Sequence, residues 1–214
     1  MVFLCVSLVA FFVSIGLTLY LFKVKETLVA ELKWRRVLTH PAKVTLDPDT
    51  AHPRLIVAED GKSVRQGDTQ QDLPDNAKRF DYECCLLGRE GFTSGCHYWE
   101  VEAGAGKYWA VGVARDSVSR KGEFMSDLNP ERGIWAIRLY GGQYHAFTSP
   151  KTPLTLRHSP SRIRVCLDCD RGQVAFFDAK NQAPIFTFLP ASFTGERIHP
   201  WFWVRGGSQL SLCH

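Results

Sequence analysis

The chain has 214 residues, of which 45% are hydrophobic and 22% charged, and its formal net charge is +4. This length provides for one sizeable hydrophobic core and argues against two. Because the net charge is small and the basic residues are scattered along the chain, the composition excludes a dedicated nucleic-acid-binding surface.

The first segment is apolar. Residues 2–22 contain neither a charge nor a proline, and 21 such residues form a helix of roughly 31 Å, about the thickness of the hydrocarbon core. A secretory signal peptide fits less well, because no basic region precedes the apolar run and no small-residue cleavage site follows it. We therefore predict a transmembrane helix over residues 1–22, which places the protein in a membrane.

A basic segment follows. Its bases are Lys23, Lys25, Lys33, Arg35 and Arg36. The positive-inside rule then predicts a single-pass protein whose C-terminal part is cytoplasmic. Residues 23–40 lack Gly and Pro, so we expect a short juxtamembrane helix. Two copies of the chain would pair through this helix to form a homodimer.

Beyond Pro41 the sequence is typical of short strands separated by turns. The pattern predicts strands at residues 43–46, 54–58, 62–65 and 84–87. The clearest local signal follows in residues 93–114. Aromatic and β-branched residues alternate in 98–102 and again in 108–113, with a Gly-rich turn between them, and this predicts a β-hairpin with Trp99 and Trp109 in the core.

The C-terminal half continues in the same way. Residues 133–140 and 143–147 alternate on either side of Gly141-Gly142, which predicts a second hairpin. Further strands are predicted at 162–168, 173–178, 185–188 and 199–204. Many short strands at close spacing indicate an all-β, two-layer or closed antiparallel architecture.

Three motifs in this region resemble the signatures of the B30.2 (PRY-SPRY) domain in order and spacing. They are Leu46-Asp47-Pro48, Trp99-Glu100-Val101-Glu102 and Leu167-Asp168-Cys169-Asp170. In the third, Cys169 and Asp170 replace the Tyr and Glu that are usual in the family. The resemblance implies a bent antiparallel β-sandwich over residues 41–214, with a PRY part at about 41–95 and a SPRY part at about 96–214. Together with the apolar and basic segments, the chain resembles the transmembrane and cytoplasmic part of a butyrophilin.

The resemblance further implies a non-enzymatic module that binds a protein partner through its loops, in immune regulation or membrane scaffolding. Candidate contact residues come from the second predicted hairpin and from a basic loop. They are Trp135, Arg138, Tyr140, Tyr144 and Phe147, with Arg115, Arg120 and Lys121. Tyr and Arg are common at binding hot spots. For Trp135 and Phe147 the alternative is a place in the core, since large aromatic side chains are usually buried.

One branch of the butyrophilins holds phosphorylated isoprenoid metabolites in a basic pocket of this domain, which gives an alternative function as a metabolite sensor. The resemblance places Ala110, His145 and Lys151 at three positions of that pocket. A diphosphate needs several fixed charged donors. Because Ala110 has none and imidazole is mostly neutral at pH 7, we expect such a site to be weak here.

Cysteine usage and the remaining motifs indicate no chemistry of their own. The seven cysteines are Cys5, Cys84, Cys85, Cys96, Cys166, Cys169 and Cys213, an odd number without regular spacing, so we predict reduced thiols rather than a disulfide framework. Cys166-X-X-Cys169 has no second pair and no nearby His, so we expect no metal site. We find no nucleophile and base pattern and expect no enzymatic activity and no cofactor.

Overall fold

The computed structural model describes residues 14–22, 24–25, 41–122 and 128–213. The chain divides into two units, Met1–Thr39 and His40–His214. In the first unit, residues 14–22 and 24–25 are helical. Within the described ranges, no helix combines the length and the apolarity needed to cross a membrane.

Most of the predicted N-terminal elements lie outside the described residues. The predicted membrane span is described only over residues 14–22, and the predicted juxtamembrane helix only at 24–25. The expected pairing of two copies through residues 23–40 therefore stays a prediction.

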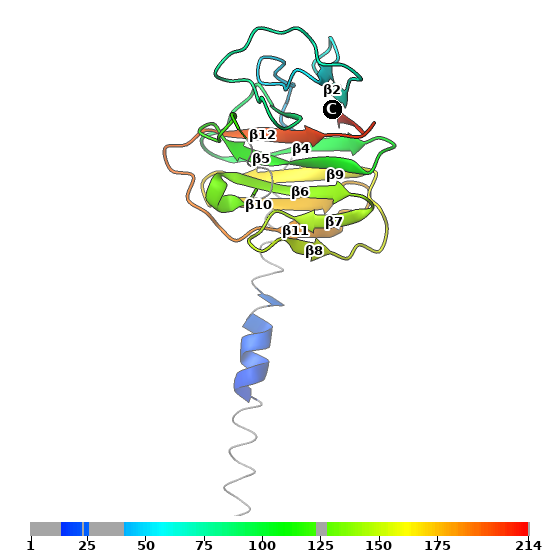
Figure 1. The fold of residues 1–214 in the computed structure, drawn as a ribbon. Helices are drawn as coiled ribbons and strands as arrows, with labels where there is room; N and C mark the ends of the chain where they lie inside the picture. Colours follow the sequence, from blue (N-terminus) through cyan, green and yellow to red (C-terminus); the bar gives the residue numbers. More distant parts are fainter. Residues whose placement is uncertain (1–13, 23, 26–40, 123–127, 214) are drawn as a thin grey trace, which may run out of the picture. The chain divides into compact units, whose positions relative to one another are not determined.

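The second unit consists of two antiparallel sheets that lie one on the other (Figure 1). One, which we call the β9 sheet, has seven strands in the order β1-β2-β13-β4-β9-β10-β11. They are β1 (Leu55–Val57), β2 (Ser63–Gln66), β13 (Gln209–Cys213), β4 (Cys96–Ala103), β9 (Arg162–Asp168), β10 (Gln173–Asp178) and β11 (Pro184–Thr187).

The other, which we call the β6 sheet, has six strands in the order β3-β12-β5-β6-β7-β8. They are β3 (Cys85–Leu87), β12 (Ile198–Val204), β5 (Tyr108–Arg115), β6 (Ile134–Tyr140), β7 (Gln143–Ala146) and β8 (Thr152–Leu154). A short 3-10 helix, η2 (Pro130–Arg132), precedes β6. The predicted all-β, two-layer antiparallel architecture is confirmed.

The hairpin predicted for residues 93–114 is wrong. Both strands exist, but β4 pairs with β13 and β9, whereas β5 pairs with β12 and β6 in the other sheet. The link between them crosses from one layer to the other, and Gly104 N donates to Gln209 O on β13 rather than to β5. Alternation shows which side chains of a strand face inward, but it does not show which strand lies beside it.

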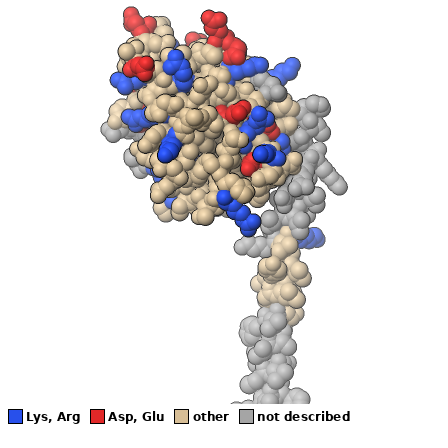
Figure 2. All heavy atoms as spheres, turned by 90° about the vertical axis from the view of Figure 1, so that its right-hand side faces the viewer, with Lys and Arg blue, Asp and Glu red and all other residues tan. Residues whose placement is uncertain are grey.

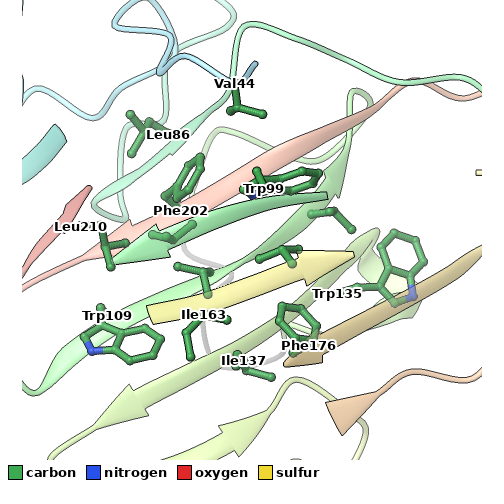
Figure 3. Close-up of a cluster of buried hydrophobic side chains, with 14 of the residues drawn as sticks. Val44, Leu86, Trp99, Trp109, Trp135, Ile137, Ile163, Phe176, Phe202 and Leu210 are labelled. Carbon is green, nitrogen blue, oxygen red and sulfur yellow. The ribbon is translucent and has the colours of Figure 1, made fainter. Parts of the chain in front are cut away.

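The inward-facing residues of both strands meet in the core between the sheets. Trp99 and Trp109 are each 1% exposed, as predicted. Figure 3 shows these rings with Trp135, Phe176 and Phe202 among aliphatic side chains of both layers. Burying a large apolar side chain stabilises the fold by about 1.5–3 kcal/mol, so this layer supplies most of the driving force for folding.

A second apolar cluster covers part of the outer face of the β6 sheet. Phe80, Val118 and Leu128 come from loops and pack there with Phe147 and Trp201. Strand β12 is consequently buried along its whole length. The outer face stays accessible at the other ends of β5, β6 and β7, where the candidate site lies.

The other strand predictions, which also rest on local sequence patterns, are correct in part. The β6–β7 hairpin is confirmed, and its Gly141 and Gly142 have φ values of 58° and 91°, which suit a two-residue turn of the primed type. Residues 43–46 form no strand, since only Leu46 makes an isolated bridge, to Gly88. Strands β8 and β13 were not predicted from the sequence.

Candidate functional site

The candidate site is built on the outer face of the β6 sheet by strands that are neighbours in space. In the register, Tyr108 on β5 lies opposite Tyr140 on β6. One pleat further along, Arg138 on β6 lies between Ala110 on β5 and His145 on β7. Because side chains alternate along a strand, these residues share the face that points away from the core between the sheets.

Three aromatic rings form what we call the aromatic platform: Tyr108, Tyr140 and Trp203. The Tyr140 ring is 5.2 Å from that of Tyr108 in an edge-on arrangement, and 6.4 Å from that of Trp203 in a stacked one. Trp203 is nearly buried and its Nε1 donates to Glu83 Oε2 at 3.0 Å. Tyr140 is 47% exposed. The exposed ring therefore rests on fixed neighbours.

Arg138 lies beside the platform. Its guanidinium carbon is 5.1 Å from the Tyr140 ring centre and 5.7 Å from that of Phe147. Its Nε is buried and has no hydrogen-bond partner. Burial lowers the pKa of Arg138, with Tyr140 acting in the opposite direction and no carboxylate contributing among the described residues. Despite this lower pKa, the guanidinium of Arg138 remains charged at neutral pH.

His145 lies directly across from Arg138. Burial, and then the charges of Arg138 and Lys151, lower the pKa of His145, while the backbone of Gln143 raises it in part. The ring is consequently neutral at pH 7. Its Nδ1 is buried and makes no hydrogen bond. The structure thus brings the sequence-predicted pocket residues Ala110 and His145 into one row, with Arg138 between them.

Three of the predicted contact residues are not exposed anchors. Trp135 is 1% exposed and faces the core between the sheets. Phe147 is also 1% exposed and packs edge-on against Trp201, beneath Arg138. Tyr144 points inward to Trp109, with ring centres 6.0 Å apart, because its neighbours in β7 take the outward positions. Tyr140 and Arg138 remain from the predicted set.

The Tyr144 hydroxyl forms a 2.6 Å hydrogen bond with Ser159 Oγ. Both residues line an open pocket of about 490 Å³ between β7, β8 and the loop at residues 155–159. His145, which belongs to the candidate face, also lines this pocket. Among the described residues that line it, no charged side chain is buried.

The predicted basic loop is engaged within the protein. Arg115 Nη1 is 3.4 Å from Glu196, Arg120 Nη2 is 2.9 Å from Asp116, and Lys121 Nζ is 2.6 Å from Asp75. The Arg120 side chain is only 10% exposed. These three residues tie loops together instead of forming a free basic patch. On the face that Figure 2 shows, basic and acidic residues are interspersed.

Sequence reasoning missed Tyr108, Glu83 and Trp203. Trp201, Phe202 and Trp203 are consecutive aromatic residues of β12, so no alternation marks which of them faces outward. Only the pairing of Trp203 with Ala110 assigns it to the outer face.

The two cysteines of the Cys166-X-X-Cys169 motif are unreactive thiols. The described cysteines are all free. Burial raises the pKa of Cys166 and of Cys169 to about 12, so both are protonated thiols at neutral pH. Within the described part of the chain, no three His, Cys, Asp or Glu side chains are grouped so that they could hold a metal ion.

Comparison with known proteins agrees with the resemblance seen in the motifs. The family model for the SPRY-associated domain, PRY, matches residues 44–92, and that for the SPRY domain matches residues 96–213. Butyrophilin subfamily 1 member A1 from Bos taurus is 47% identical over 194 residues, 90% of this chain and 36% of that protein. Erythroid membrane-associated protein from Homo sapiens is 45% identical over 170 residues, 79% of this chain and 35% of that protein.

The chain thus spans about a third of the length of these relatives. Among solved structures, the TRIM65 PSpry domain superposes with a TM-score of 0.72 at 22% identity, covering 84% of this chain and 94% of that one. The fold and both family models agree, and the chain belongs to the SPRY domain family, in the B30.2 form in which a PRY segment precedes the SPRY domain.

Proposed function

We propose that this chain is a membrane-anchored, non-enzymatic protein whose B30.2 domain binds a protein partner through the outer face of the β6 sheet. The observation that carries the proposal is the half-exposed Tyr140 ring, held by Tyr108 and Trp203 beside Arg138. Rigid aromatic and Arg side chains lose little conformational entropy on binding and are enriched at hot spots.

Membrane anchoring rests on the uncharged residues 2–22 and on the bases that follow them. A relative that is named as membrane-associated supports it. The likeness to butyrophilins supports a role in immune regulation or membrane scaffolding.

The cytoplasmic orientation is tested with an antibody against a C-terminal tag, applied before and after selective permeabilisation of the plasma membrane. A cytoplasmic C-terminus is stained only after permeabilisation.

Partner binding is tested by proximity labelling in cells that express the full chain. We expect Tyr140→Ala to remove a specific set of labelled proteins, because truncation takes away the central exposed ring. Leu189→Ala is the matched control, since Leu189 is 88% exposed and outside the platform. If both variants label the same proteins as the wild type, the platform is not the binding face.

A second candidate function is sensing of a phosphorylated metabolite, which the row Ala110, Arg138 and His145 favours. It predicts a ligand-induced rise in melting temperature that is lost in His145→Ala and Lys151→Ala. We expect no such rise with a prenyl diphosphate, since His145 is neutral and Ala110 donates nothing. Micromolar affinity in a calorimetric titration would contradict this expectation.

A further inference from the structure

The guanidinium of Arg138 is placed for a ligand that the described chain does not contain. Its carbon lies over two aromatic rings, 5.1 Å from the centre of Tyr140 and 5.7 Å from that of Phe147. Its Nε is buried without a partner, and no ion pair or hydrogen bond joins it to any residue of the described ranges. An arginine has five N–H donors, and a half-buried one is normally bonded to carbonyls or carboxylates.

The row Ala110, Arg138 and His145 holds one positive charge at pH 7, that of Arg138. The carboxylate of Glu83, beside the platform, accepts a hydrogen bond from Trp203 Nε1. The charge of Lys151 also acts on His145, but Lys151 lies outside the row, in the segment before β8. A single planar cation next to exposed aromatic surface matches a singly charged, planar anion attached to an apolar chain.

We propose that Arg138 receives the carboxylate of an Asp or Glu side chain from the protein partner, whose adjacent residues pack on Tyr140. This inference rests on the proposed function and specifies the chemistry of the partner. A carboxylate accepts two parallel N–H bonds from a guanidinium, and here they would come from Nη1 and Nη2, since Nε is buried.

A phosphate group fits this place less well. It carries a charge of about −1.5 to −2 at pH 7, and such groups are usually held by several cations. Charge complementarity therefore favours an acidic segment of a protein.

The test uses the full chain in lipid nanodiscs and random linear peptides displayed on phage. Peptides that bind the wild type but not Tyr140→Ala are collected and synthesised with acetylated and amidated ends.

We expect the selected peptides to share an Asp or Glu. Arg138→Gln, and separately the change of that acid to its amide, should each weaken binding by about tenfold to a hundredfold, and combining the two changes should add little. Arg138→Lys keeps the charge without the planar fork and should recover only part of the affinity.

Arg157→Gln is the matched control. Arg157 is exposed on the neighbouring loop, so its loss removes the same charge without touching the contacts between Arg138 and the two rings, and should change affinity less than about twofold. Circular dichroism melting of each variant confirms that it is folded.

The outcomes separate the two proposals. Peptides that need Tyr140 but share no acid, or losses that add independently, overturn the carboxylate assignment and leave the platform as the binding face. Tighter binding of inorganic pyrophosphate than of the peptides, abolished by Arg138→Gln, also overturns it. If no selected peptide depends on Tyr140, the proposed function itself fails.

Discussion

Arg79 is a buried cation whose side chain, in the described part of the chain, donates hydrogen bonds only to backbone carbonyls. It is 5% exposed, and its Nη1 donates to Ala51 O at 2.6 Å and to Pro48 O at 3.0 Å, while its Nε donates to Pro74 O at 3.3 Å. These bonds join two loops of the PRY segment. Neither the composition nor a motif marks Arg79 for this role, because the two carbonyls that its Nη1 binds, of Pro48 and Ala51, come from residues that are distant in sequence.

We expect Arg79→Ala to lower the free energy of unfolding by about 2–4 kcal/mol, because it removes a buried side chain with three hydrogen bonds and takes the Arg79 donor from the buried Ala51 carbonyl. Chemical denaturation of the full chain in detergent, followed by tryptophan fluorescence, measures this. The exposed Arg157→Ala should change stability by less than about 0.5 kcal/mol. Equal effects of the two substitutions would show that the Arg79 bonds contribute nothing specific.

His52 makes stability depend on pH. Burial lowers its pKa from 6.5, and its Nδ1 accepts a hydrogen bond from Arg54 N at 3.0 Å. Since the folded state resists protonation more than the unfolded state does, its stability is full above pH 6.5 and falls as the pH drops below that value. His145, whose pKa is also lowered, acts in the same direction.

His52→Asn keeps an acceptor near the Nδ1 position but cannot be protonated. We expect the variant to lose less stability than the wild type between pH 7 and pH 5, as measured by denaturant midpoints across this range. An unchanged pH dependence would assign the effect to other groups.

At the scale of elements, the sheet register decides what local patterns cannot. The β6–β7 hairpin is predictable because both its strands and its Gly141-Gly142 turn are adjacent in sequence. Residues 98–102 and 108–113 carry an equally clear alternation, but they belong to different layers. The outward position of Arg138 and the inward one of Tyr144 likewise follow from which strand lies next to which.

Strand β5 contains a position where only glycine fits. Gly112 lies opposite Ala136, and a Cβ added there would collide with the backbone carbonyl of Trp135. Gly112→Ala should therefore push β5 away from β6 and lower the free energy of unfolding by about 1–3 kcal/mol.

Gly104→Ala serves as its control. A Cβ at Gly104 would approach Gln209 O at 3.4 Å, which is nearly an ordinary contact. Thermal denaturation of both variants should give a clearly lower midpoint for Gly112→Ala alone. Similar midpoints would mean that the β5–β6 spacing adapts without cost.

At the scale of the molecule, the two family segments form a single fold through the C-terminal strand. Strand β13 lies between β2 of the PRY segment and β4 of the SPRY segment. In the other sheet, β3 of the PRY segment pairs with β12. The first and last parts of the B30.2 domain therefore depend on each other.

We expect deletion of residues 209–214 to abolish cooperative unfolding, because it removes strand β13 and separates the β1–β2 pair from the rest of the sheet. Limited proteolysis of the full chain should then cut in the PRY segment within the time that leaves the wild type intact. Deletion of His214 alone is the control and should behave like the wild type. A protected PRY segment in the longer deletion would contradict this dependence.

The sequence by itself determined the family, the all-β class, most strand positions and the burial of Trp99 and Trp109, because these depend on motifs and on alternation along one strand. The tertiary structure alone decided which strands are neighbours, and with that the platform of Tyr108, Tyr140 and Trp203 and the unpaired place of Arg138. The physical reason is that backbone hydrogen bonds between strands join residues that are far apart in the chain, so a face built across four strands has no local signature.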